Sequence, residues 1–510
     1  MMIFQKAQER PAHTFWSLAV FIVILSLFSL LPNIQDSLRI DEPFSANLIK
    51  LSWANFFEAF LYDKAAPLYY IFLKLWASLF GDSELALRSF SAVCFALTTF
   101  LVGLTAFELG GIFAGLAALL LAAMSNVGLV FAGIARPYAL LSLLTAASTY
   151  LFLMIMAVMH GNSMTGRKRL MVAAGFITIN TLGLLTHPIF IFYMIGCNLA
   201  ALLKYRQIFW LVSLCSLATL GLFLVMWGPY SIHTLSLPTV NWMEKPDLGD
   251  LIHAYLNVWG VKKTILLAGY IVLITLGNYD AARDFITSRI GLTSFILLAA
   301  TSLLPFAVSQ YQVVFNDTRM PALFFPIACV FIGLLLTRFN TIWLTSGLLV
   351  LLLGYVVAVP VFAGGNHGLE KTPKSSIQFA VEHAACGDIF ISGGLSINET
   401  VYYLRRLHAP GCIENIAYPA SMQAHPGWMD PPSLLAHREA LTQEADNLVK
   451  ELDQKLGTNG RVWFFYEQDA YRQNVLDILE RELDQNMVLT QTMEGYGSFF
   501  DKIYVYISKH

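Results

Sequence analysis

The sequence predicts a polytopic α-helical membrane protein with a soluble α/β domain at its C-terminal end. Of the 510 residues, 56% are hydrophobic and only 13% are charged, whereas a soluble globular protein has about 25% charged residues. Several apolar stretches run for about 20 residues, the length needed to cross about 30 Å of hydrocarbon. From about residue 365 onward the composition becomes mixed, which indicates a soluble domain.

The apolar stretches predict about 11 transmembrane helices. The first runs from Phe15 to Leu31. It is long for the apolar part of a signal peptide, and no small-residue cleavage site follows it, so we expect it to span the membrane. The expected spans are 14–32, 88–107, 111–131, 138–158, 170–186, 188–203, 208–228, 264–277, 290–308, 321–337 and 341–362.

Basic residues in the short loops predict the orientation, because they concentrate on the cytoplasmic side. If the spans alternate, every basic cluster falls on one side of the membrane. An odd number of spans then places the C-terminal domain outside, in the periplasm if the chain lies in a bacterial inner membrane. The clusters are Lys6 and Arg10, Arg167 to Arg169, Lys204 and Arg206, Arg283 and Arg289, and Arg338.

Two domains are therefore expected: a transmembrane domain over residues 1–363 and a periplasmic α/β domain over residues 364–510. The first outer loop, residues 33–87, is long. Its segments 46–62 and 67–80 mix aromatic and polar residues, which is typical of helices lying in the membrane interface.

The C-terminal domain contains short apolar runs of strand length, separated by sequence of helical character. We expect strands at 388–392, 461–466 and 502–507, with helices at 376–385 and 471–485.

The cysteines indicate the compartment of the C-terminal domain, and the net charge bears on nucleic-acid binding. Cys386 and Cys412 lie in the C-terminal domain and are expected to pair in an oxidising compartment. The remaining four cysteines lie in apolar spans, where cysteine acts as a small core residue. The net charge of -2 gives no basic surface for nucleic acid.

The polar residues that are candidates for catalysis or ligand binding lie on the outer side of the membrane in the expected topology. Asp41 and Glu42 follow the first span as adjacent carboxylates, which are either a solvated pair or a reactive one. Lys64 precedes a proline turn and an aromatic segment; it either binds an anion or extends to the lipid headgroups.

Two arginines precede expected helices that begin near a proline. Arg136 begins the segment Arg-Pro-Tyr, and Arg319 lies just before Met320-Pro321. An arginine beside a helix N-terminus is suited to bind phosphate oxygens. The alternative is that the arginine anchors the helix at the membrane interface. His187 follows Thr186 at the outer end of the fifth span, where a histidine is either a functional candidate or a boundary residue with its hydrogen bonds satisfied.

Residues 398–400 match a glycosylation sequon, a pattern common by chance. The sequence has no Walker loop, dinucleotide fingerprint, zinc-finger spacing or nucleophile elbow.

The outer-side segments that carry these candidate residues resemble those of the GT-C superfamily of membrane glycosyltransferases. They are most similar to the protein O-mannosyltransferases (glycosyltransferase family 39) and the lipid A aminoarabinose transferases (family 83). Asp41-Glu42 matches the family's loop carboxylates, and residues 63–70 with 79–89 resemble its second loop segment. Where relatives often have His-Pro-Pro, this chain has Lys64-Ala-Ala-Pro67, so Lys64 replaces a histidine as the candidate.

The resemblance implies an inverting transfer of a sugar from a polyprenyl-phosphate donor to an acceptor glycan, lipid or protein at the outer face. Asp41 would be the base, with Glu42 as its partner. Arg319, Lys64 and Arg136 would hold the donor phosphate, and Tyr138, His187 and Tyr69 would contact substrate. The chemistry requires no metal, although outer carboxylates are able to bind a divalent cation.

Three other functions remain open. A transporter or lipid flippase predicts internal repeats and broken helices with charges near the bilayer midplane. A non-catalytic scaffold leaves the clustering of charged residues on one face unexplained. Oligosaccharide transfer from a diphosphate lipid is a third possibility.

Overall fold

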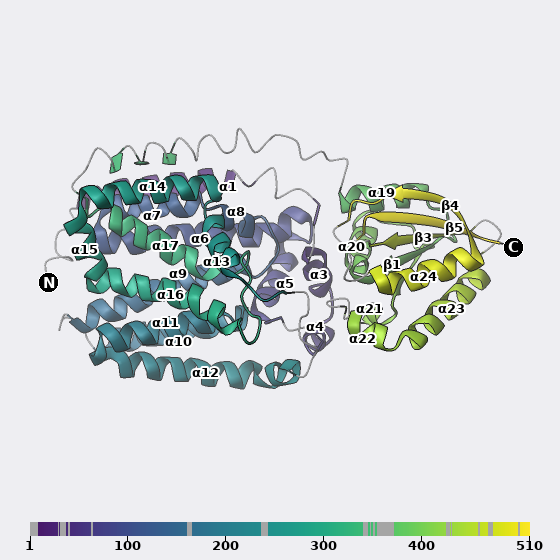
Figure 1. The fold of residues 1–510 in the computed structure, drawn as a ribbon, viewed down its shortest axis with the longest axis horizontal. Coiled ribbons are helices and arrows are strands. Elements are labelled where there is room, and N and C mark those ends of the chain that lie inside the picture. Colours follow the sequence, from purple (N-terminus) through teal and green to yellow (C-terminus); the bar gives the residue numbers. More distant parts are fainter. Residues whose placement is uncertain are drawn as a thin grey trace. The chain divides into compact units, whose positions relative to one another are not determined.

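The structure, a computed structural model, divides the chain into two compact units, which we describe separately (Figure 1). The helical unit comprises Met1–Ile34, Ala66–Pro229 and Met243–Gly365, and the α/β unit comprises Gln35–Ala65, Tyr230–Trp242 and Asn366–His510. The residues described are 9–28, 30, 37–38, 41–62, 65–160, 166–235, 243–339, 345–346, 348–349, 352–353, 372–424, 429, 431–456, 460–467, 473–497 and 500–509.

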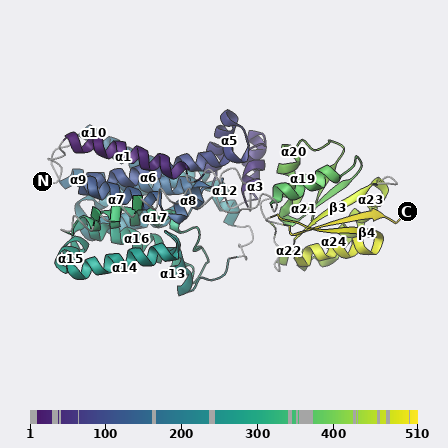
Figure 2. The same cartoon turned by 90° about the horizontal axis from the view of Figure 1, so that it is seen from above.

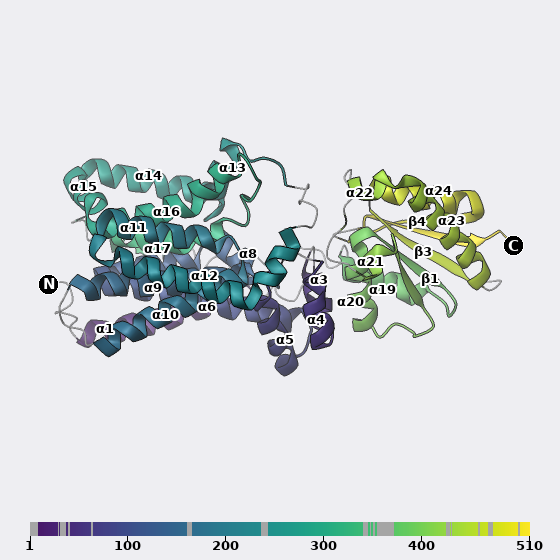
Figure 3. The ribbon, with the colours of Figure 1, turned by 90° about the horizontal axis from the view of Figure 1, so that it is seen from below.

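The helical unit is a bundle arranged around α17, which packs against α6, α7, α9 and α16 (Figure 3). Most side chains of α17 are buried, so this helix lies inside the bundle. The helices of this unit are α1 (Glu9–Phe28), α5 (Leu68–Phe80), α6 (Glu84–Gly110), α7 (Ile112–Ala123), α8 (Asn126–Ala132), α9 (Tyr138–His160), α10 (Gly166–Thr186), α11 (Phe190–Lys204), α12 (Arg206–Leu235), α13 (Leu248–Asn257), α14 (Val261–Gly277), α15 (Tyr279–Thr287), α16 (Arg289–Val308) and α17 (Pro321–Leu336).

The predicted class, a polytopic helical membrane protein with a C-terminal α/β domain, is confirmed. Within the described residues, five helices are long and apolar enough to cross a membrane, or up to seven if each bent helix pair counts as one span. Each of the first ten expected spans coincides with a helix or a bent helix pair. The eleventh, 341–362, lies mostly outside the described residues.

The two bent pairs bond to each other at their breaks. The pair α7 and α8 bends by 59°, and the pair α13 and α14 bends by 86°. The Ser125 hydroxyl donates to the Val258 carbonyl at 2.9 Å, and the Trp259 indole N–H donates to the Leu121 carbonyl at 2.8 Å. Carbonyls released by each break thus find a hydrogen-bond partner within the protein.

The α/β unit contains a five-stranded sheet in the order β2-β1-β3-β5-β4. Strands β2, β1 and β3 are parallel, while β5 is antiparallel to both β3 and β4. Helices α19 and α20 cover one face and α24 the other (Figure 2). The elements are α3 (Glu42–Leu48), α4 (Trp53–Ala59), α19 (Pro373–His383), β1 (Ile389–Gly393), the 3-10 helix η1 (Gly394–Ser396), α20 (Ile397–Arg406), β2 (Glu414–Tyr418), α21 (Ser421–Ala424), α22 (Pro431–Ala436), α23 (Arg438–Lys455), β3 (Arg461–Tyr466), α24 (Gln473–Asn486), β4 (Met487–Glu494) and β5 (Lys502–Ser508).

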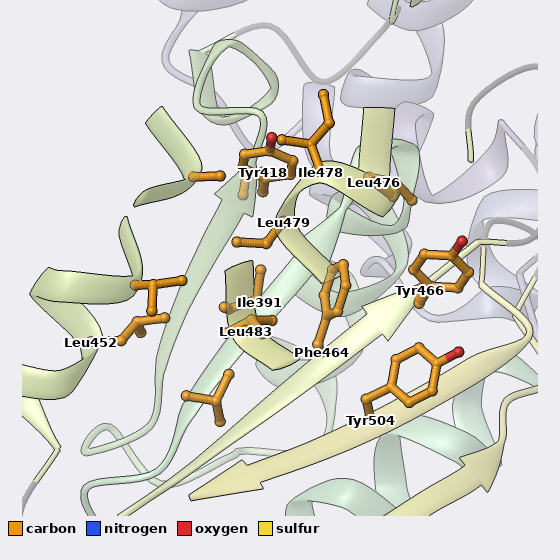
Figure 4. Packing of buried hydrophobic residues seen from close by; sticks show 14 of the residues in the cluster. Ile391, Tyr418, Leu452, Phe464, Tyr466, Leu476, Ile478, Leu479, Leu483 and Tyr504 are labelled. Carbon is orange, nitrogen blue, oxygen red and sulfur yellow. The ribbon is translucent and has the colours of Figure 1, made fainter. Parts of the chain in front are cut away.

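The hydrophobic core of this unit lies between the sheet and helices α23 and α24 (Figure 4). Alternate residues of the strands, such as Ile391 and Phe464, meet Leu452 of α23 and Leu479 of α24. All four are fully buried, and burying a side chain of this size contributes about 1.5–3 kcal/mol. The core therefore holds α23 and α24 on one face of the sheet.

A disulfide and a buried carboxylate secure the amino-terminal edge of β1. Cys386 and Cys412 are bonded, with their Cα atoms 5.1 Å apart, so the expected pairing is confirmed. Asp388 is almost fully buried; it accepts hydrogen bonds from the Arg461 backbone N–H at 2.9 Å and from the Trp463 indole at 2.9 Å. These donors satisfy a charge that would otherwise be costly to bury.

Candidate active site

Four of the sequence-predicted residues lie together in the helical unit. Arg136 is in the turn before α9, and Tyr138 begins that helix. His187 lies in the short link between α10 and α11, and Arg319 just precedes α17. Since α9 packs against α10, α11 and α17, the ends of these helices meet. We call these four residues the cationic cluster.

The Tyr138 ring is the centre of the cationic cluster. Its centroid lies 6.3 Å from that of the His187 ring and 5.9 Å from the guanidinium carbon of Arg319. A guanidinium at this distance is attracted by the negative face of an aromatic ring. Phe131 packs against the same ring, at 5.1 Å between centroids. The tyrosine therefore holds the arginine and the histidine at fixed places beside it.

His187 is neutral in this setting. Burial, together with the positive charges of Arg319 and Arg136, lowers its pKa to about 3. Its Nδ1 accepts a hydrogen bond from the backbone N–H of Ile189 at 3.3 Å. The ring proton is therefore on Nε2, which makes that atom a hydrogen-bond donor.

The local sequence positions Arg319 at the start of α17. The Asn316 side chain accepts hydrogen bonds from the Thr318 backbone N–H at 3.2 Å and the Arg319 backbone N–H at 3.1 Å. Such a turn, in which asparagine bonds to the backbone beyond it, reverses the chain. Pro321 then begins α17, as proline suits the first turn of a helix.

Sequence analysis missed two residues of this loop region. His253 of α13 contacts the Asp317 carboxylate at 2.5 Å, although the two residues are 64 positions apart in the sequence. The contact ties α13 to the loop that carries Arg319. No spacing in the sequence predicts a contact between residues so far apart. The one indication in the sequence was that Asp317 lies close to the candidate Arg319.

The carboxylates Asp41 and Glu42 belong to the α/β unit. Asp41 is the N-terminal cap residue of α3, and its carbonyl accepts the Ser45 backbone N–H at 3.2 Å. Glu42 is only 2% exposed, whereas Asp41 is half-buried. The two neighbours thus differ in access to solvent, and Asp41 is the more accessible of the two.

The remaining candidates have different positions. Tyr69 of α5 is fully buried; its hydroxyl bonds to the Ser91 hydroxyl on α6 at 3.0 Å, and its ring packs against Phe90. Lys64 lies outside the described residues. The sequon asparagine, Asn398, is buried, and its amide nitrogen donates to the Leu395 carbonyl at 3.2 Å, so the sequon is part of the core.

Among the residues that the structure describes, no group of three or more histidine, cysteine, aspartate or glutamate side chains is arranged to hold a metal ion. What the cationic cluster offers is two guanidinium groups, one neutral imidazole and an aromatic ring. This combination suits a ligand with a phosphate group, since charge-assisted hydrogen bonds from arginine fit phosphate oxygens.

Comparison with known proteins supports the fold. No family model and no curated protein sequence matches the chain. Among solved structures, the chain is similar to ArnT from Cupriavidus metallidurans bound to undecaprenyl phosphate, with a TM-score of 0.61, 13% sequence identity and 97% of each chain covered. It is also similar to the oligosaccharyltransferase of Archaeoglobus fulgidus, with a TM-score of 0.53, 12% identity, and coverage of 97% of this chain and 74% of that one. The chain therefore shares its overall fold with these two proteins.

Proposed function

We propose that this protein is an inverting glycosyltransferase that moves a single sugar, hexose or pentose, from a polyprenyl-phosphate donor to an acceptor on the outer face of the membrane. The observation that carries the proposal is the cationic cluster, in which Arg319, Tyr138 and His187 meet at the ends of buried helices. Arg136 also acts electrostatically on His187. A phosphate held there meets two positive charges and an imidazole N–H.

In the proposed reaction, the Asp41 carboxylate takes the proton from the acceptor hydroxyl as its oxygen attacks the anomeric carbon. A new carbon–oxygen bond forms as the bond between the anomeric carbon and the phosphate oxygen breaks. The phosphate leaves with the electron pair, and Arg319 and Arg136 stabilise the charge that develops on it. Neutral His187 donates a hydrogen bond without needing to be protonated. Lys64 remains a third candidate for the phosphate, and Glu42 a partner of Asp41.

The proposed donor class is supported by the chemistry of the cationic cluster and by the neighbour structure. The ArnT crystal contains undecaprenyl phosphate, and a comparable lipid phosphate is the ligand that we propose for this chain. The acceptor is a glycan, a lipid or a protein. Tyr138 and His187 are proposed to contact the substrate. Tyr69, the third residue proposed to do so, is buried against α6 and bonds to Ser91.

We further propose that the chain lies in a bacterial inner membrane with the α/β unit in the periplasm. The Cys386–Cys412 disulfide supports this placement, because disulfides form and persist in oxidising compartments. The basic clusters of the opposite loops support it independently.

The proposal is tested by mass spectrometry of cell-envelope glycolipids, glycans and proteins from cells with and without the gene. A sugar that is attached only when the gene is present is the expected result. The purified protein, reconstituted with the lipid-linked form of that sugar, must then release polyprenyl phosphate as the sugar is transferred.

The same preparation separates the alternatives. Movement of the lipid-linked sugar across the bilayer without a new glycosidic bond would identify a transporter or flippase and overturn the proposal. Release of a polyprenyl diphosphate together with an oligosaccharide would identify the diphosphate-lipid reaction. Broken helices are a feature that the transporter alternative predicts, and the structure has two bent helix pairs. At their breaks, the Val258 and Leu121 carbonyls accept hydrogen bonds from Ser125 and Trp259, so these carbonyls already have partners within the protein.

A further inference from the structure

The segment that carries Asp41 is attached to the α/β unit on both sides of that residue. Before Asp41, Ser37 and Leu38 contact Tyr403 of α20. After Asp41, Asn47 at the end of α3 contacts the backbone of Asn398, also on α20. Helices α3 and α20 pack against each other between these points. All of these contacts lie within the α/β unit.

The contact before Asp41 is a chain of buried hydrogen bonds. The Tyr403 hydroxyl accepts the Leu38 backbone N–H at 2.7 Å and lies 2.7 Å from the Ser37 hydroxyl. The Ser37 hydroxyl also accepts the Lys374 backbone N–H at 3.2 Å. Tyr403 is fully buried, so loss of its hydroxyl leaves a buried N–H without an acceptor.

The contact after Asp41 uses both ends of one amide side chain. The Asn47 nitrogen donates to the Asn398 carbonyl at 2.9 Å, and the Asn47 oxygen accepts from an Arg405 guanidinium nitrogen at 3.5 Å. Helix α3 has only seven residues. A helix this short is not stable alone, because nucleation is costly, so its direction depends on these contacts with α20.

From this arrangement we infer that Tyr403 is a positioning residue for Asp41, and that the α/β unit serves the transfer reaction by holding the Asp41 carboxylate in place. The inference rests on the proposed function, in which Asp41 is the base. Tyr403 itself touches no reacting atom; it acts by fixing Leu38 and Ser37, just before Asp41 in the chain. A base displaced by about 1 Å loses as much as 10²-fold in rate.

The test compares Tyr403→Phe with Tyr418→Phe in the full-length reconstituted protein. Both substitutions remove one hydroxyl from a fully buried tyrosine of the α/β unit, but the Tyr418 hydroxyl donates to the Leu441 carbonyl, away from the Asp41 segment. Tyr403→Phe is expected to lower kcat about 10-fold with an unchanged KM for the lipid-linked donor, and to speed amide hydrogen exchange over residues 37–48. Tyr418→Phe is expected to do neither.

The Asp41→Asn background distinguishes positioning from a general structural effect. If Tyr403 acts through Asp41, adding Tyr403→Phe to Asp41→Asn causes no further fall in kcat. A full additional fall, or unchanged kcat and exchange in Tyr403→Phe alone, would overturn the inference while leaving the proposed function intact. Normal turnover by Asp41→Asn would instead remove the proposed base, and with it the basis of the inference.

Discussion

The guanidinium carbon of Arg319 lies 5.9 Å from the centroid of the Tyr138 ring, although α17 and α9 are far apart in the sequence. The contact brings a cation from the start of α17 to the start of α9, where Arg136 and His187 complete the cationic cluster. This pairing underlies our predictions on donor binding and on pH.

Arg319→Ala is expected to weaken binding of undecaprenyl phosphate about 10- to 100-fold, because it removes charge-assisted hydrogen bonds of about 1.5–3 kcal/mol. The affinity of Arg319→Lys for undecaprenyl phosphate should lie between those of the wild type and Arg319→Ala, since lysine keeps the charge and loses the planar fork. Binding is measured with labelled undecaprenyl phosphate and purified protein. The matched control is Arg338→Ala, an arginine beyond the other end of α17 whose guanidinium lies 5.7 Å from the Phe285 ring centroid. Equal losses in both alanine variants would contradict the phosphate role of Arg319.

Asp41→Asn is expected to reduce turnover by about 10²–10⁴-fold while leaving binding of undecaprenyl phosphate unchanged, because the shape is kept and only the proton acceptor is lost. Steady-state kinetics with the lipid-linked donor provide the measurement. Glu58→Gln, which changes an exposed carboxylate on α4, is the control and should have wild-type turnover. If Asp41→Asn turned over normally, Glu42 would be the next candidate for the base.

His187 should make stability depend on pH. Its pKa is about 3 in the folded protein against an ordinary value of 6.5, because it is buried beside Arg319 and Arg136. As pH falls from 6.5 toward 3, the unfolded chain binds a proton that the folded protein does not, so stability falls by up to about 1.4 kcal/mol per pH unit. The contribution of neutral His187 is therefore complete above pH 6.5.

Thermal unfolding of the detergent-solubilised protein between pH 4.5 and 7.5 measures this effect. His187→Gln should make the decline in Tm at acid pH shallower, whereas His437→Gln, at an exposed position, should leave it as steep as in the wild type. Parallel curves for His187→Gln and the wild type would show that His187 is not buried in its neutral form.

Because Cys386 and Cys412 are bonded, the other four cysteines are expected to carry free thiols. Alkylation under denaturing, non-reducing conditions should modify only Cys94, Cys197, Cys215 and Cys329, and all six cysteines should react after reduction. The paired variant Cys386→Ser/Cys412→Ser should destabilise the α/β unit by about 3 kcal/mol, as expected for a loop of this length. Six reactive thiols before reduction would disprove the bond in the cell.

Topology is checked by single cysteines introduced at exposed positions. Lys50→Cys and Ser433→Cys should react with a membrane-impermeant maleimide in intact spheroplasts, and Arg167→Cys should not. Reaction at only one of the two outer positions would contradict a shared periplasmic location. Reaction at Arg167→Cys in intact cells would reverse the predicted orientation of α10.

The sequence alone determined the membrane class, the positions of the helices at the first ten expected spans and the α/β nature of the C-terminal domain. Hydrophobic length and periodicity are local properties, so they can be read within a window of about 20 residues. The strand 461–466 coincides with β3, whereas β2 and β4 were not predicted. Strand β2 has exposed and half-buried positions in its first half, and β4 is exposed over most of its length, so neither has the continuous run of buried positions that β1 and β3 have.

Only the tertiary structure decided which candidates meet. Arg136, Tyr138, His187 and Arg319 come together because α9, α10, α11 and α17 pack side by side, and helix packing depends on side-chain shape over long sequence separations. The sequence divided the chain near residue 363, yet Asn47 of the first loop bonds to Asn398, 351 residues away, within the α/β unit. Tyr69 looked equivalent to Tyr138 in sequence, but it packs against Ser91 in the α5–α6 interface. An amphipathic segment predicts that a helix will form. The residues that the helix packs against determine which groups its polar side chains contact.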